Sequence, residues 1–174
     1  MLNSVQHYVK GLLDNLPTLM TEPIKAYVQP PQLADAAGGP VAYVWGGRLN
    51  VSRQTAPRIR GQQNFNWDVS VAVTQAFDQD APNLESAFPL VLDQIMATVA
   101  TTPLQVKGVW LTDPDTGVQT QLLSIGEHFS LDYTSVATTS GAGVGLWVFA
   151  ADISFPLEEK VSFQPGTYYN PGTP

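Results

Sequence analysis

The chain has 174 residues and a net charge of −7, with 44% hydrophobic and 13% charged residues, which predicts one folded domain and excludes an intrinsically disordered chain. The absence of cysteine excludes disulfides, thiolate nucleophiles and thiolate metal sites, and no apolar stretch approaches the roughly 18 residues of a membrane-spanning helix. The sequence opens without a basic region, apolar run and cleavage site, so we expect a cytoplasmic protein whose acidic surface disfavours nonspecific binding to nucleic acid.

The first sixteen residues predict an amphipathic helix. Six apolar residues recur at offsets of 0, 3, 4, 7, 8 and 11 from Val5, which places them on one helical face. Pro17 ends the helix. Two short strands are predicted next, at 24–29 and 41–47, separated by a turn-rich loop at 30–40. The apolar face of the helix comprises Val5, Tyr8, Val9, Leu12, Leu13 and Leu16.

A basic segment with the sequence GGRLNVSRQTAPRIRGQQN follows at residues 46–64. It holds all four arginines of the chain, Arg48, Arg53, Arg58 and Arg60, and no acidic residue. Its Gly, Pro, Ser and Gln content and poor periodicity predict a long loop or arm. Because arginine pairs well with carboxylates and phosphates, we expect this loop to contact an acidic surface or a phosphate backbone. A solvated loop without a partner is the alternative.

The most regular strand pattern lies at 66–77, where apolar residues alternate with polar or small ones. One face of this strand is therefore expected in the core and the other exposed or lightly covered. Residues 81–100 predict a second amphipathic helix. Pro89 is compatible with this helix if its continuous part begins near Ser86 or Ala87, which places the proline in the first turn. The apolar face of the strand comprises Trp67, Val69, Val71 and Val73.

Antiparallel hairpins are predicted for most of the remaining chain. The turn sequence DPDTG at 113–117 separates two strand candidates, and a glycine-rich stretch at 138–145 separates two more. Residues 161–174 alternate Pro and Gly with aromatics, which predicts an extended tail after a single domain at 1–160. The order of elements predicts an α+β fold, with a mixed, mainly antiparallel sheet and two helices packed on one of its faces.

A search for catalytic groups and metal ligands finds no set with suitable spacing, so we expect no enzymatic activity, no metal and no cofactor. His7 and His128 have no second ligand on the same face. Asp113 and Asp115 are a candidate carboxylate pair, but turn formation explains them better because aspartate bonds to backbone two residues on. The glycine-rich run at 141–145 lies between strand candidates, unlike a dinucleotide-binding loop.

Aromatic residues fall into two groups. The tryptophans lie in strand candidates, where burial in the core or in an interface explains them without a ligand. Phe163, Tyr168 and Tyr169 lie in the tail, and we expect them to contact a neighbouring surface because aromatics are enriched at protein interfaces. The tryptophans are Trp45, Trp67, Trp110 and Trp147.

The whole layout combines an opening amphipathic helix, a long loop after an early hairpin and a single central helix, PNLESAFPLVLDQIMATVATTP, followed by antiparallel strands. Over residues 1–160 it resembles the tail terminator, or tail completion, proteins of long-tailed bacteriophages. The resemblance implies a homo-oligomeric ring of six subunits that caps the tail tube, stops its polymerisation and joins the tail to the head. It implies tail tube and head–tail connector proteins as partners, DNA passing through the lumen, no membrane, and assembly in the host cytoplasm into the virion.

In such a ring the arginine segment is expected to line the lumen or to bind the acidic rim of an adjoining ring. A first alternative is another head–tail connector or a tail tube subunit. A less favoured alternative, from a different class, is a small-molecule binding domain or enzyme with a pocket beside the sheet. Closed single rings favour the tail terminator, long cylinders favour a tail tube subunit, and saturable binding of a small molecule favours the ligand-binding domain or enzyme.

Overall fold

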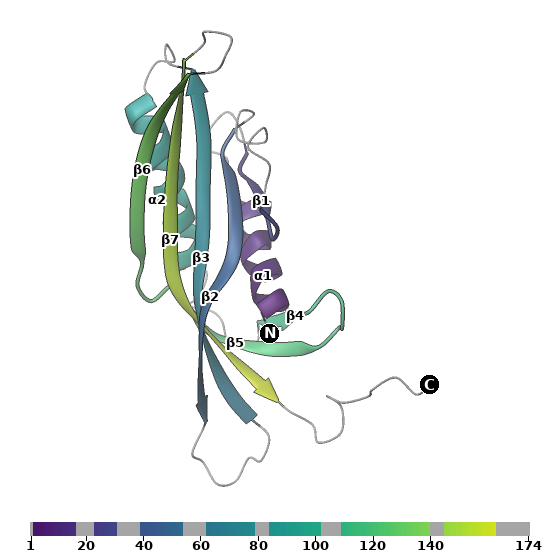
Figure 1. The fold of residues 1–174 in the computed structure, drawn as a ribbon. Helices are drawn as coiled ribbons and strands as arrows, with labels where there is room; N and C mark the ends of the chain where they lie inside the picture. The colour runs from purple at the N-terminus through teal and green to yellow at the C-terminus, as the bar shows by residue number, and fades with distance from the viewer. Residues whose placement is uncertain are drawn as a thin grey trace.

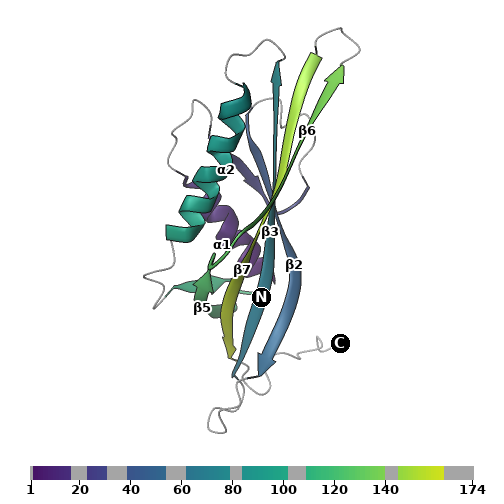
Figure 2. The same cartoon turned by 90° about the vertical axis from the view of Figure 1, so that its left-hand side faces the viewer.

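Two helices pack on one face of a mixed, mainly antiparallel sheet in the computed structural model (Figures 1 and 2). The structure describes residues 2–16, 23–30, 39–53, 62–78, 84–101, 109–139 and 145–162. Within these ranges the elements in chain order are α1 (Leu2–Asp14), β1 (Lys25–Tyr27), β2 (Val41–Arg53), β3 (Gln62–Asp78), α2 (Leu84–Thr101), β4 (Trp110–Thr112), β5 (Gln119–Ile125), β6 (Ser130–Thr139) and β7 (Gly145–Ser162). The expected α+β fold class is confirmed.

The sheet is organised around the long strand β7. Its strand order is β1-β2-β3-β7-β5-β4, and β6 pairs with β7 outside this path. Strand β3 pairs with β7 along its whole length, whereas β6 pairs with residues 145–154 of β7 and β5 with residues 157–160. Only the β1–β2 pair is parallel among the described strands. Both predicted hairpins, β4–β5 and β6–β7, are therefore confirmed.

The core lies between the helices and the inner face of the sheet. The predicted alternation in β3 is confirmed, because Val69, Val71 and Val73 are fully buried and the intervening residues are not. The apolar face of α1 is also confirmed, with Val5, Val9 and Leu13 buried, and the other three predicted residues are partly buried. Full burial of such a side chain contributes about 1.5–3 kcal/mol. The buried face of α2 comprises Phe88, Val91, Leu92, Ile95 and Val99.

Helix α2 differs from the prediction at its start. It begins at Leu84 rather than near Ser86 or Ala87, so Pro89 lies inside the helix, beyond the first turn. Proline has no N–H, and the helical bond to the carbonyl of residue 85 is therefore missing. The helix tolerates this loss because its apolar face, from Phe88 to Val99, is buried against the sheet.

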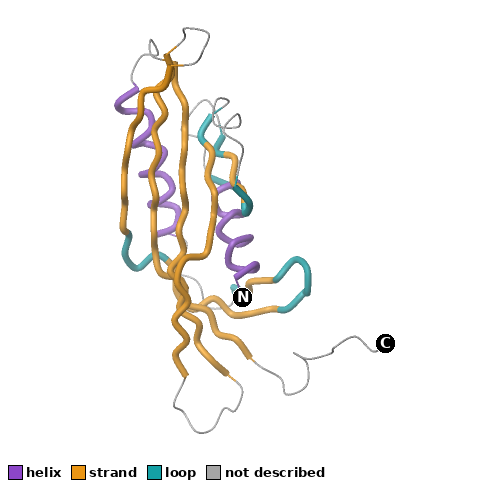
Figure 3. Tube along the Cα trace, viewed as in Figure 1, coloured by secondary structure: helices purple, strands orange, loops and turns teal. Residues whose placement is uncertain are grey.

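The basic segment also differs from the prediction. Its described residues, 46–53 and 62–64, are strand rather than loop, since β2 continues to Arg53 and β3 begins at Gln62; residues 54–61 lie outside the described ranges. Backbone pairing supports this conformation without an apolar alternation, because Arg53 is opposite Gln63, which in turn is opposite Val161. We call residues 48–53, 62–66 and 158–162 the arm, which projects beyond the helices (Figure 3).

Candidate interaction surfaces

The structure places only part of the predicted contact residues. Arg48 is exposed in β2, beside a register shift between Gly46 and Leu49, and Arg53 is the last residue of the strand. Both belong to the arm. The other predicted contact residues, Arg58 and Arg60 and the tail aromatics Phe163, Tyr168 and Tyr169, lie outside the described residues.

The candidate carboxylate pair at 113–115 forms a turn, as predicted. The Asp113 carboxylate Oδ1 accepts hydrogen bonds from the backbone N–H groups of Thr116, at 2.9 Å, and Asp115, at 3.0 Å. The bond from Thr116 is the main reason that the pKa of Asp113 is lowered. Asp115 instead accepts from the side-chain amide of Asn3, at 2.8 Å. The two carboxylates therefore hold the β4–β5 turn and its contact with α1.

Elsewhere in the described part of the chain, titratable side chains do not cluster into a candidate catalytic or metal site. No three His, Asp or Glu residues there are placed to hold a metal ion. His7 lies on α1, and His128 lies in a bend before β6 rather than at the start of a strand. Among the described helices, none combines the length and apolar character needed to cross a bilayer.

The second face of the sheet, which we call the open face, is lined mainly by small side chains. In the described ranges neither helix covers it (Figure 2). Register places twelve of its residues in three rows across β2, β3, β7 and β6, and Ser, Ala and Thr fill most positions. The rows are Trp45, Ser70, Ser154 and Ser130; Tyr43, Ala72, Asp152 and Asp132; and Val41, Thr74, Ala150 and Thr134.

A shallow hollow of about 150 Å³ lies in this face, over β3, β7 and β6. Its lining includes Ala72, Ala150, Asp132 and Asp152. These two aspartates are exposed and directly opposite each other on antiparallel strands. Like charges at such positions destabilise a strand pair. The lone chain therefore carries an electrostatic cost that a positive group in the hollow would remove.

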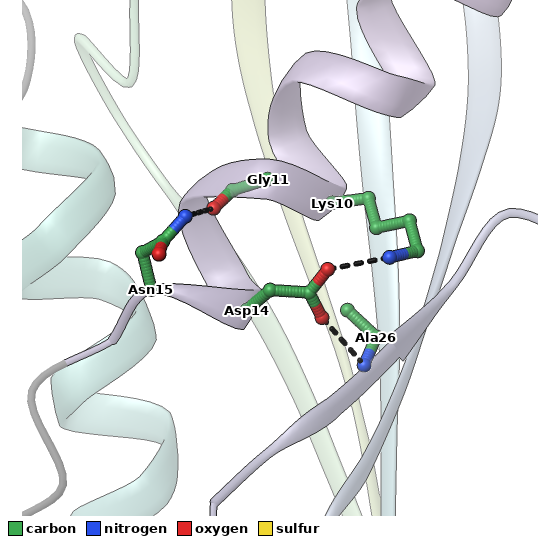
Figure 4. Close-up of polar contacts among 5 residues, drawn as sticks. All are labelled: Lys10, Gly11, Asp14, Asn15 and Ala26. Atoms are coloured by element: carbon green, nitrogen blue, oxygen red, sulfur yellow. Dashed lines mark hydrogen bonds and ion pairs between the residues drawn. The ribbon is translucent and has the colours of Figure 1, made fainter.

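The edge at β1 is short and blocked by α1. Figure 4 shows the Asp14 carboxylate beside β1, where its Oδ1 accepts from the backbone N–H of Ala26 at 3.3 Å. The other oxygen of Asp14 binds the ammonium of Lys10, and the Asn15 amide donates to the Gly11 carbonyl at 2.7 Å. The end of α1 thus occupies a backbone donor that a further strand would need.

The edge at β6 is long and open by comparison. This ten-residue strand pairs on one side with β7, and on its other side no strand of the described ranges pairs with it. Residues 130–135 are all exposed, including Leu131 at 42% and Tyr133 at 49%. A long exposed edge with large apolar side chains is a template for another polypeptide.

Glu159 anchors the base of the arm. Its carboxylate is fully buried and accepts hydrogen bonds from Trp67 Nε1, at 2.8 Å, and from the Thr120 hydroxyl. These donors lie on β3 and β5, so one side chain of β7 joins three strands. Buried charges are retained when hydrogen bonds satisfy them.

Sequence reasoning missed the open edge, the opposed aspartates and Glu159. The pairing order of β6 and the register of Asp132 against Asp152 depend on contacts between distant strands, for which single residues carry no signal. Glu159 does have a sequence signal, because an acidic residue there interrupts the inner-face alternation of Ile153, Phe155 and Leu157.

Comparison with models of known families and with curated proteins finds no match.

Proposed function

We propose that this protein is a structural subunit of a long-tailed bacteriophage that closes with copies of itself into a ring. In this proposal the ring, of six subunits by resemblance, caps the tail tube, ends its polymerisation and joins the tail to the head. The observation that carries the proposal is the open β6 edge with its exposed Leu131 and Tyr133.

An open edge of this length favours assembly. Natural proteins shorten, charge or cover such edges because they otherwise pair with other chains, and β1 is treated in this way by Asp14. The β6 edge carries one acidic residue among its described exposed positions, Asp132, beside two large apolar side chains. A closed ring of head-to-tail contacts buries one such edge per subunit and leaves none free.

The described surface supports an assembly role better than a small-ligand site. The hollow on the open face, at about 150 Å³, is smaller than the roughly 300–1,000 Å³ of ordinary ligand pockets. It is lined mainly by small residues, with Tyr133 and two aspartates, and such a lining is suited to contact with another protein.

The test is the mass and shape of the particle. We expect closed single rings in native mass spectrometry and negative-stain electron microscopy, and association of these rings with the ends of purified tail tubes. Leu131→Lys places a charge on the β6 edge and is expected to abolish the rings. Leu90→Lys is the matched control, because Leu90 is 55% exposed and lies on α2 rather than on β6, and its rings are expected to persist.

Two results contradict the proposal. A wild-type protein that remains monomeric at high concentration and ignores tail tubes has no assembly role of this kind. Long cylinders in place of single rings identify a tail tube subunit instead.

A further inference from the structure

Opposite charges are segregated on two surfaces of this chain. The open face carries exposed Asp68, Asp132 and Asp152, and the twelve residues in its three rows include no Lys or Arg. The arginines, in contrast, are confined to residues 48–60, a stretch without an acid that begins in the arm. The chain therefore carries an acidic surface and a basic segment of complementary charge, and Arg48 and Arg53 of this segment lie in the arm.

The hollow has the chemistry of a site for a guanidinium group. At about 150 Å³ the hollow is smaller than an ordinary ligand pocket, so we expect it to hold one long side chain rather than a folded element. Asp132 and Asp152 face each other across adjacent strands, which lie about 4.8 Å apart. The planar guanidinium presents five N–H donors in a fixed geometry and binds carboxylates in a bidentate manner.

The end of the arm, at Arg53, does not reach the hollow of its own chain. Asp152 is level with Ala72 on β3, whereas Arg53 is level with Gln63 on the same strand, nine residues away. At about 3.4 Å per residue this separation is roughly 30 Å along a continuous ladder. A contact between Arg53 and the hollow is therefore a contact between two copies, and it joins different surfaces of each. Contacts of this kind propagate head to tail, and they close into a ring when the rotation from one copy to the next allows it.

We infer that the hollow on the open face of one copy receives an arginine from the arm of the next copy. The inference rests on the proposed ring and assigns the arginine segment to a subunit–subunit contact rather than to DNA in the lumen. The bound guanidinium neutralises the repulsion between Asp132 and Asp152, so assembly removes a cost that the free subunit carries.

The test uses two neutral variants of the full chain. The arm variant combines Arg48→Gln and Arg53→Gln, and the face variant combines Asp132→Asn and Asp152→Asn. Each alone is expected to weaken self-association by at least about thirty-fold, since truncating one partner of a bonded charge pair has effects of this size. Circular dichroism checks that both variants fold. Asp93→Asn, exposed on α2, is the control that keeps its rings.

Mixing the two variants gives the sharpest result. The arm variant retains an intact hollow and the face variant an intact arm, so an equimolar mixture has one working contact per pair. We expect heterodimers in native mass spectrometry and no rings. An interface that uses the same patch on both subunits does not produce this pattern.

Three results overturn the inference. If the wild type forms rings and both variants form them equally well, the contact lies elsewhere and the proposed function stands. If the arm variant keeps its rings and loses only binding to tail tubes or to DNA, the arm has another partner. If the wild type itself never associates, the proposed function fails together with the inference.

Discussion

Replacing Glu159 is expected to destabilise the protein strongly. Glu159→Ala leaves the Trp67 indole N–H and the Thr120 hydroxyl without their acceptor in a buried site. Each orphaned buried donor costs about 1–3 kcal/mol, so the two together cost roughly 2–6 kcal/mol. At about 2–4 °C per kcal/mol for a chain of this size, the melting temperature falls by roughly 10 °C.

Glu159→Gln is expected to cost less, about 1–2 kcal/mol, because its carbonyl still accepts from one donor and the hydroxyl can rotate to accept from its amide. Urea denaturation followed by far-ultraviolet circular dichroism measures both values. Glu158→Ala is the matched control: Glu158 is half-buried and accepts from the Asn64 amide at 2.7 Å, and its loss is expected to cost less than about 1 kcal/mol.

The reasoning is refuted if Glu159→Ala and Glu158→Ala have equal effects, or if Glu159→Gln is as damaging as Glu159→Ala. Either result means that the hydrogen bonds to the carboxylate do not join the three strands. A smaller effect on stability with a large loss of ring formation instead places the role of Glu159 in the orientation of the arm.

Three further predictions concern turns and charges. Gly126→Ala is expected to destabilise the fold more than Gly117→Ala. Both glycines have φ of 69°, a backbone conformation that costs alanine about 1–2 kcal/mol, but of the two only Gly126 has a neighbour that the new Cβ would meet, Val99 Cγ1 at 2.8 Å. Thermal denaturation compares the two variants. Because the pKa of Asp113 is lowered in the folded state, its carboxylate stabilises the fold at pH values above its unfolded pKa near 3.9, and this contribution is lost as pH falls through the folded pKa. Asp113→Asn is therefore expected to reduce the dependence of the unfolding free energy on pH below about 4. An unchanged pH dependence in the variant contradicts this prediction. Asp132→Thr is expected to stabilise the isolated subunit by about 0.2–1 kcal/mol by relieving the repulsion of the opposed carboxylate, and a destabilised monomer in urea excludes that repulsion.

The sequence predicted the parts of the fold that are in contact with the core. Periodicity identified α1, α2 and β3 because their apolar faces, such as Val69 to Val73, are buried against each other. The turn at Asp113 was predictable because its bonds are local. The basic segment was predicted as a long loop or arm, and its strands at 48–53 and 62–64 were missed because they pair through the backbone and show no apolar alternation. Fragments such as VSR and GQQN therefore carry no strand signal.

For the candidate interaction surfaces, the sequence identified a basic segment but no receptor for it. The acidic hollow depends on the register that sets Asp132 opposite Asp152 and Ala72 beside them. A shift of one residue would turn each of these side chains to the other face. Such a register is decided by the packing of whole strands and cannot be read from the residues themselves.

Strand β3 pairs with β7 without interruption, from Gln62 opposite Ser162 to Asp78 opposite Leu146. The length of this strand pair is therefore fixed by its number of residues. This length sets the spacing between the hollow and the end of the arm, which are the two surfaces of the inferred contact. Removing two facing residues from each strand shortens the strand pair by about 7 Å and preserves the face to which every side chain points. Removing one from each turns the side chains beyond the deletion to the other face of the sheet, so this spacing can change with side-chain direction preserved only in steps of two residues.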